Sequence, residues 1–175
     1  MNYYQAKPNK PFHLSVAAII IDDNNEVLCQ HYNQLNSWNN IYWLMHSTVN
    51  PYETLEQALS RGLAEENGIS AKVITFIGVK DYKSNWFGEI NQETEVTKSI
   101  AYFIVKYLGE DKSLINIENP GSKSNLEKLS ISEAKQKMKS QALKYNNLEL
   151  DESGMLERAE KYLENYTEES FSELA

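Results

Sequence analysis

The sequence predicts an α/β domain in which helices cover both sides of a β-sheet. Two observations indicate this fold class: β-favouring runs and amphipathic helical stretches are mixed along the chain, and 175 residues are enough for one hydrophobic core but short for two. No internal repeat or domain boundary interrupts the pattern. Residues 1–11 are polar, contain Pro8 and Pro11, and are expected to form an irregular arm, whereas residues 12–175 are expected to form the single domain.

The composition limits the partners that the protein can have. A formal net charge of −8 argues against a basic face for duplex nucleic acid, and an acidic protein that handles phosphorylated molecules needs metal ions to mediate the contact. The single cysteine, Cys29, cannot form a disulfide within the chain. The N-terminus lacks the pattern of a signal peptide, and no apolar run is long enough to span a bilayer. We therefore expect a cytoplasmic protein without membrane contact.

Strand signals dominate the beginning of the chain. Residues His13–Ile21 form a nearly continuous β-favouring run, which is typical of a strand buried on both faces. The turn-forming cluster Asp22–Asn25 precedes a second run, Glu26–Tyr32, so the two runs predict a hairpin. A polar loop is expected over Asn33–Asn40, and a short apolar piece, Ile41–Met45, follows it.

The later part of the chain alternates in the same way. Further strands are predicted over Ala71–Val79 and Lys98–Leu108. The stretch Glu110–Asn125 is loop-like, a helix is predicted over Ser132–Leu143, and a clearly amphipathic helix over Asp151–Asn165.

A helix is also predicted over Leu55–Glu66, between the two groups of strands. Thr54 and Gln57 fit a capping box at its start, and Asn67–Gly68 supplies a C-terminal stop. A start one turn earlier, at Asn50–Pro51, fits the same sequence.

One face of this helix is apolar and ends in two acids. The apolar stripe consists of Leu55, Ala58, Leu59 and Leu63. At about 100° per residue, Glu65 and Glu66 continue that stripe, and half-buried like charges are costly unless a cation neutralises them. Arg61 lies one turn away and can neutralise the two acids in part, whereas a bound Mg²⁺ or Mn²⁺ would neutralise them better. The alternative is that both acids simply end a surface helix beside Arg61.

The spacing around this helix resembles a known motif. The segment contains, in order, Glu53, seven residues, Arg61, then Leu63, Glu65, Glu66, Gly68 and Ile69. It resembles the Nudix box: glycine, five residues, glutamate, seven residues, then arginine–glutamate–apolar–x–glutamate–glutamate–x–glycine–apolar. Seven of the nine specified positions match. The departures are Ser47, where the box begins with glycine, and Gly62, where it has the glutamate that follows arginine.

The resemblance extends over about residues 12–165. The first strand, its hairpin, Trp43–Leu44 before the box and Leu129–Ala134 before a late helix all stand where Nudix domains have similar segments. It implies a Nudix-type α/β/α sandwich with a mixed sheet.

The resemblance also implies a function. It points to a Nudix-type pyrophosphohydrolase that cleaves a nucleoside diphosphate linked to another moiety by divalent-metal-assisted attack of water on phosphorus. It assigns Glu65 and Glu66, with the backbone carbonyl of Ser47, to binding Mg²⁺ or Mn²⁺, and it assigns Arg61 and Glu53 to an ion pair that orients the helix. The sequence does not fix which small-molecule nucleoside diphosphate derivative is the substrate. Nudix domains often pair, so a homodimer is one option.

The two departures remove features that the motif supplies. Gly62 has no carboxylate to offer and weakens the helix by about 1 kcal/mol relative to alanine. Ser47 replaces a glycine in a loop that usually turns sharply, although its carbonyl remains. His46 is a candidate replacement ligand, and the alternative is a loop histidine without a partner.

Acids outside the motif are further candidates for metal binding. Glu93 and Glu95 precede a predicted strand, and their alternative role is that of solvated loop acids. Asp151 and Glu152 are weaker candidates, because acids at a helix start are explained by the helix dipole.

Other functions remain open at this stage. Tyr42, Trp86 and Phe87 are candidates for stacking on a base, and packing is the alternative. A catalytically impaired Nudix-fold protein that binds a nucleotide or regulates a partner is the alternative to the hydrolase. Isoprenoid isomerisation through a catalytic cysteine is set aside, because Cys29 lies in a predicted strand and the sequence identifies no acidic or histidine partner for it.

Overall fold

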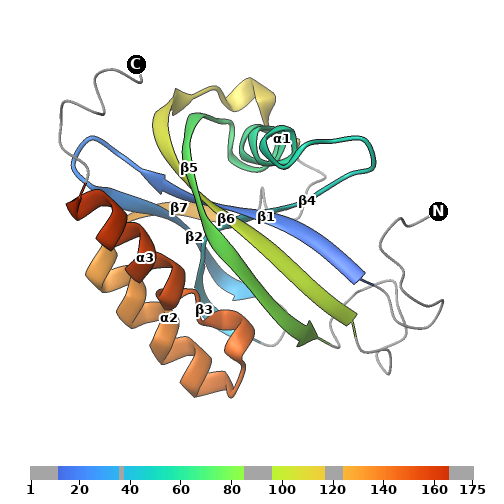
Figure 1. The fold of residues 1–175 in the computed structure, drawn as a ribbon. Coiled ribbons are helices and arrows are strands. Elements are labelled where there is room, and N and C mark those ends of the chain that lie inside the picture. Colours follow the sequence, from blue (N-terminus) through green and yellow to red (C-terminus); the bar gives the residue numbers. More distant parts are fainter. Residues whose placement is uncertain (1–11, 36–37, 85–95, 117–123, 166–175) are drawn as a thin grey trace.

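The protein is a mixed β-sheet with helices on both faces, as the sequence predicts (Figure 1). The computed structural model describes residues 12–35, 38–84, 96–116 and 124–165. Within them the seven-stranded sheet has the order β3-β2-β1-β6-β5, with β4 paired to β1 and β7 to β2. Only β1 and β6 run parallel; the other described pairs are antiparallel. The strands are β1 (Phe12–Ile21), β2 (Glu26–Leu35), β3 (Trp38–Trp43), β4 (Met45–Thr48), β5 (Ile69–Ser84), β6 (Val96–Glu110) and β7 (Asn125–Ser130).

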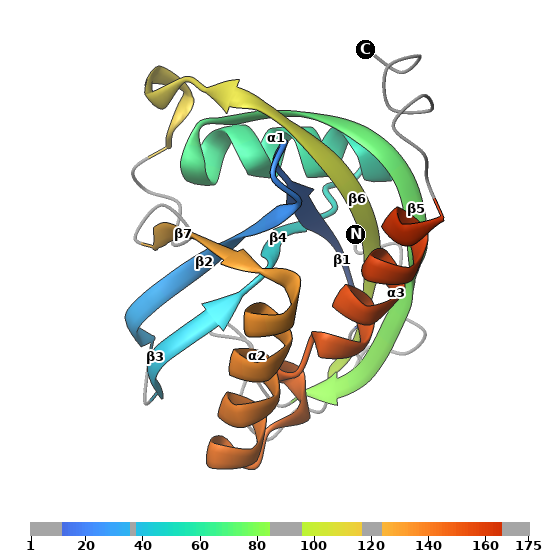
Figure 2. The ribbon, with the colours of Figure 1, turned by 90° about the vertical axis from the view of Figure 1, so that its left-hand side faces the viewer.

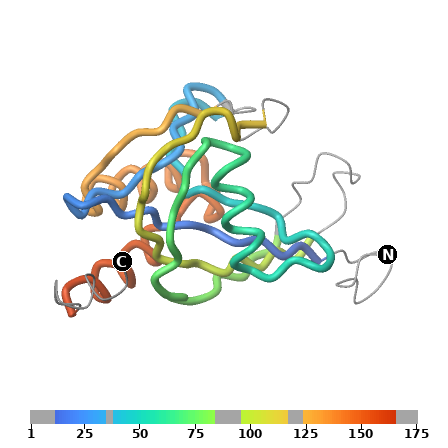
Figure 3. The backbone as a smooth tube through the Cα atoms, turned by 90° about the horizontal axis from the view of Figure 1, so that it is seen from above, coloured from blue at the N-terminus to red at the C-terminus, as the bar shows by residue number. Residues whose placement is uncertain are grey.

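Three α-helices in the described residues cover this sheet. Figure 2 shows α1 (Leu55–Asn67) over one face and α2 (Ile131–Tyr145) with α3 (Ser153–Glu164) over the other. After β4 the chain reverses direction into α1, so this helix returns along the strand that precedes it (Figure 3). Short 3₁₀ turns, η1 (Lys112–Leu114) and η3 (Leu148–Leu150), lie in the connections after β6 and α2.

The core has two halves because β1 is buried on both faces. Val16, Ala18 and Ile20 pack with the apolar stripe of α1, whereas Ala17 and Ile19 face α2 and α3. This arrangement explains why the β1 sequence is apolar throughout instead of alternating. Each face of the sheet therefore has its own packed core, and α1, the helix that carries the motif, packs on one of these faces.

The predicted polar loop Asn33–Asn40 is wrong. β2 continues to Leu35 and β3 begins at Trp38, with Gln34 opposite Asn39 in the antiparallel register. β3 lies at the edge of the sheet, and the facing backbone groups of β2 and β3 pair while the side chains of Gln34 and Asn39 stay exposed to water. Polarity alone therefore did not separate an edge hairpin from a loop.

Three other boundaries also differ from the sequence prediction. The apolar piece Ile41–Met45 divides at Leu44 between β3 and β4, and the end of the predicted loop Glu110–Asn125 begins β7. β7 pairs with β2, and its Leu126 and Leu129 pack on the two core clusters between polar neighbours. The helix predicted from Ser132 starts at Ile131, because Ser130 and Glu133 form its capping box.

Candidate active site

The helix that carries the motif begins and ends as its sequence predicts. Thr54 is its N-cap and forms the reciprocal capping box with Gln57, so the alternative start at Asn50–Pro51 is wrong. Gly68 ends the helix with φ +67° and donates its N–H to the Ala64 carbonyl. Because that left-handed conformation favours glycine, the chain can turn directly from α1 into β5.

Arg61 ties the helix to the segment before it. Its Nε donates to Glu53 Oε1 at 2.6 Å and its Nη2 to Glu53 Oε2 at 3.0 Å, which makes the pair bidentate. Nη2 also donates to the Thr48 carbonyl at 2.8 Å, and Nη1 to Glu65 Oε2 at 3.1 Å. The hydrogen bond from Arg61 lowers the pKa of Glu53. One guanidinium thus joins the end of β4, the loop before α1 and the last turn of α1.

The two adjacent acids have different surroundings. Glu65 is half-buried and paired with Arg61, whereas Glu66 is only 9% exposed. Gln30 Nε2, on β2, donates to Glu66 Oε2 at 2.8 Å and to Asn67 Oδ1 at 3.1 Å. Burial raises the pKa of Glu66 to about 7, against the opposing effect of the Gln30 hydrogen bond. Of the two acids, only Glu66 is buried as the helical stripe predicts.

A buried carboxylate of this kind fits a cation. Glu66 has an amide as its hydrogen-bond partner and no ion-pair partner among the described residues, so its negative charge is poorly compensated. Carboxylate, carbonyl and hydroxyl oxygens are the donors that Mg²⁺ and Mn²⁺ prefer. Within the described ranges, no three His, Cys, Asp or Glu side chains gather closely enough to hold a metal ion. Carboxylates from the described residues alone therefore do not complete a metal site.

The two departures from the motif are in contact with each other. Ser47 lies on β4, paired with Val16 of β1, and is 8% exposed. A Cβ added to Gly62 would lie 2.4 Å from Ser47 Cβ and 2.6 Å from Ser47 Oγ. The Ser47 side chain therefore occupies the space that a side chain at position 62 would need. Ser47 also sits in a regular strand, not in the sharp loop expected there.

His46 has a partner that the sequence did not reveal. Its Nε2 is 2.6 Å from Oε1 of Glu152, which is 1% exposed and also accepts from Leu44 N and Tyr102 Oη. Burial favours the neutral acid, but the charge and hydrogen bond of His46, with those other two donors, hold the pKa of Glu152 below its usual value.

Two sequence interpretations are therefore wrong. His46 is not an unpartnered loop histidine, and Glu152 is not explained by the helix dipole alone. No local pattern connects residues 106 positions apart, so spacing could not have found the pair.

The other candidates contribute less to the described site. The ring of Tyr42 is stacked on His31 at 4.4 Å, with Lys137 Nζ 4.2 Å from its centroid, and the residue is 5% exposed. Both faces of the Tyr42 ring are thus occupied by protein, and it is not free to stack on a base. The candidates Trp86, Phe87, Glu93 and Glu95 lie outside the described residues.

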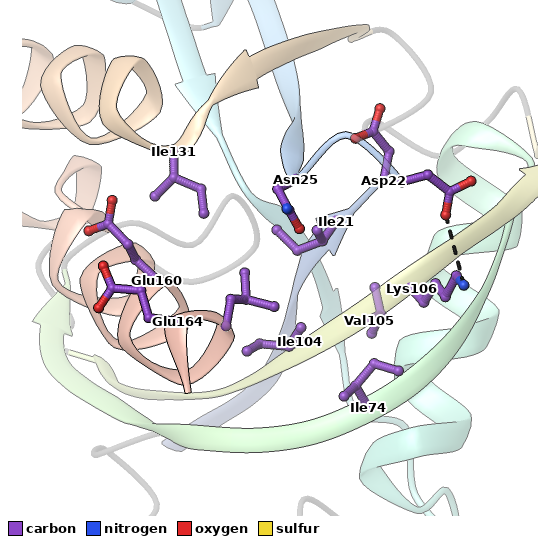
Figure 4. A pocket seen from close by; sticks show the side chains of 12 residues that line it. Ile21, Asp22, Asn25, Ile74, Ile104, Val105, Lys106, Ile131, Glu160 and Glu164 are labelled. Atoms are coloured by element: carbon purple, nitrogen blue, oxygen red, sulfur yellow. Dashed lines mark ion pairs between the residues drawn. The ribbon is translucent and has the colours of Figure 1, made fainter. Parts of the chain in front are cut away.

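A cavity of about 430 Å³ lies elsewhere in the protein (Figure 4). Its walls include Ile74, Ile104 and Ile131, with Glu160 and Glu164 from α3 at its side. None of its lining residues comes from α1 or β4. This cavity is therefore not part of the site around Glu66.

Comparison with known proteins places the site in context. The NUDIX domain family model matches residues 11–148. The fold is similar to that of a NUDIX hydrolase from Nitrosomonas europaea, with a TM-score of 0.57 and 20% identity over 75% of this chain and 80% of that one. A MutT NUDIX hydrolase from Burkholderia pseudomallei gives a TM-score of 0.52 and 18% identity over 70% of this chain and 86% of that one. No curated protein sequence matches this chain.

At these identities the two structures show a shared fold. No helix in the described part of the chain combines the length and apolar character needed to cross a bilayer.

Proposed function

This chain belongs to the NUDIX family, and from that premise we propose that it is a pyrophosphohydrolase of small nucleoside diphosphate derivatives. The observation that carries the proposal is the buried carboxylate of Glu66, which lies on α1 and has no ion-pair partner in the part of the chain that the structure describes. The reaction would be attack of water on phosphorus, which breaks the diphosphate linkage and releases two phosphorylated products or one such product and phosphate.

The roles of the described residues follow from their contacts. Glu66, Glu65 and the Ser47 carbonyl would hold Mg²⁺ or Mn²⁺, whose charge would offset the negative charge that develops on the diphosphate. Arg61 would keep Glu65 and the end of β4 in register through its bonds to Glu65 and to the Thr48 carbonyl. Glu53 would hold the guanidinium in that orientation through its bidentate pair.

A second function is favoured by one specific contact. Because Gly62 brings no carboxylate and Ser47 fills the adjacent space, the site has fewer acids than the motif supplies. A protein of this kind would bind a nucleoside diphosphate derivative and act as a binding or regulatory protein with impaired catalysis.

A substrate screen separates the two functions. The full chain is incubated with Mg²⁺ or Mn²⁺ and ADP-ribose, dinucleoside polyphosphates, nucleotide sugars and oxidised nucleoside triphosphates, in water enriched in ¹⁸O. Metal-dependent cleavage that places ¹⁸O in a phosphate product and disappears in Glu66→Gln supports the hydrolase. Glu56→Gln is the matched control, because Glu56 is an exposed acid in the first turn of the same helix. Metal-dependent nucleotide binding without cleavage supports the regulatory alternative.

A further inference from the structure

We propose that the Ser47 hydroxyl is an oxygen donor for the divalent cation, in place of the carboxylate that position 62 lacks. This inference rests on the proposed function and deepens it, because it names the source of the missing donor. It treats the two departures from the motif as one exchange, in which the donor moves from the helix to the facing strand.

The first support for this exchange is steric. Gly62 is buried on α1, and a Cβ there would lie 2.4 Å from Ser47 Cβ, much closer than two side-chain carbons can approach. The nearest atoms belong to one side chain, so Ser47 alone fills the space at the first side-chain atom of residue 62. A serine on β4 and a larger residue at position 62 therefore exclude each other.

The second support is the state of the hydroxyl. Ser47 is 8% exposed, and within the described residues its Oγ makes no hydrogen bond yet is not among the fully buried atoms without a partner, so it keeps some contact with solvent. That oxygen lies 2.6 Å from the position of a residue-62 Cβ, so it is directed at α1 and not along the sheet. A hydroxyl that has no protein partner and still reaches solvent can offer its oxygen to a bound cation.

The third support is the position of the hydroxyl relative to the acids. Position 62 is one helical turn before Glu65 and Glu66, at the spacing that puts side chains on the same face. Ser47 Oγ is therefore on the side of α1 from which the buried Glu66 projects. Hydroxyl and carboxylate oxygens are both hard donors, which suits Mg²⁺ and Mn²⁺.

The direct test is titration of the full chain with Mn²⁺, followed by calorimetry and by the electron paramagnetic resonance signal of free Mn²⁺. Ser47→Ala keeps the Cβ that packs on Gly62 and removes only the oxygen. We expect it to weaken Mn²⁺ binding by about tenfold or more, with little change in the Tm of the metal-free protein. Ser60→Ala, at an exposed serine on the same helix, should bind Mn²⁺ like the wild type.

The outcomes of this titration separate the inference from the proposed function. If the wild type and Ser47→Ala bind Mn²⁺ equally, the hydroxyl is not a donor, while the proposed metal site stands. If the wild type itself does not bind Mn²⁺, with ADP-ribose or without it, both fail.

A second experiment tests the exchange itself. Gly62→Glu alone should lower the Tm, because the new side chain meets Ser47, and the double variant Ser47→Gly with Gly62→Glu should recover it. The double variant should also bind Mn²⁺ at least as tightly as the wild type. A single Gly62→Glu variant as stable as the double one would overturn the steric basis of the exchange.

Discussion

Glu152, at the start of α3, lies 2.6 Å from His46 on β4, the strand that carries Ser47. The same carboxylate accepts a hydrogen bond from Leu44 N at the junction of β3 and β4. Glu152, on the α2–α3 side of the sheet, thus holds β4 in place. The next residue of that strand, Ser47, faces α1 on the other side. This link explains how a residue far from the motif can set its geometry.

Removal of His46 should therefore be costly. In His46→Leu the Glu152 carboxylate stays buried and loses a hydrogen-bond partner 2.6 Å away, and we expect the free energy of unfolding to fall by about 3 kcal/mol. Glu152→Gln removes the buried charge together with the pair, so its loss should be smaller. Urea denaturation at pH 7 measures both values. Glu157→Gln is the control, since its pair with Lys161 is on the surface and contributes little. A loss in His46→Leu no larger than in this control would contradict the prediction.

The buried Glu66 predicts an unusual dependence of stability on pH. Its pKa is about 7 in the folded protein against an ordinary value of 4.5, so the folded state binds more protons between these values. The contribution of Glu66 to stability is therefore fully present below pH 4.5 and is lost as pH rises through 7, by roughly 2–4 kcal/mol. Glu66→Gln has no carboxyl group at this position, so its stability should not show this dependence on pH.

Chemical denaturation in the presence of a chelator measures the effect. We expect Glu66→Gln to gain stability relative to the wild type between pH 5 and pH 8. Added Mg²⁺ or Mn²⁺ at pH 8 should reduce that gain, because the cation binds the ionised carboxylate of the wild type. A stability difference that stays constant with pH would show that Glu66 titrates normally.

Much of the fold could be predicted from the sequence because its signals are local. The apolar run of β1, the capping box at Thr54 and Gln57, and the stop at Gly68 each depend on neighbouring residues, and each is found in the structure. The spacing of the motif was equally informative, since the family match covers it. The edge hairpin of β2 and β3 was missed because its residues are polar and only pairing reveals them.

The site was less predictable because its contacts join distant segments. Sequence alone presents Ser47 and Gly62 as two independent losses, whereas the structure places one against the other. From the sequence, a glutamate restored at position 62 would be expected to add a metal ligand. In the structure, the Ser47 side chain leaves no room for that glutamate. The burial of Glu152 likewise depends on how α3 packs on the sheet. The contact between Gln30 and the buried Glu66 depends on how β2 lies against α1.

Tyr42 should be important for stability and not for nucleotide binding. Its ring lies between His31 and Lys137, so Tyr42→Leu removes buried stacking and should lower the free energy of unfolding by about 1–3 kcal/mol. The Kd or KM for a nucleotide should stay within about twofold of the wild-type value, since a difference of that size is below 1 kcal/mol. Urea denaturation and nucleotide titration measure the two quantities. A tenfold weaker affinity in a folded variant would show that the ring contacts the base.

Arg61 provides the test in which chemistry and stability separate most clearly. Arg61→Lys keeps the positive charge but loses the planar fork that binds Glu53 through two hydrogen bonds and also reaches the Thr48 carbonyl. Because this ion pair is partly exposed, the free energy of unfolding should change by less than about 1 kcal/mol. Metal-dependent hydrolysis should nevertheless fall by about tenfold or more in kcat/KM, since Glu65 and the end of β4 lose their common anchor. Arg158→Lys serves as the matched control, because within the described residues the Arg158 guanidinium makes one hydrogen bond, a long one of 3.5 Å to the Ile77 carbonyl. Equal kcat/KM values for the two lysine variants would mean that Arg61 contributes charge alone.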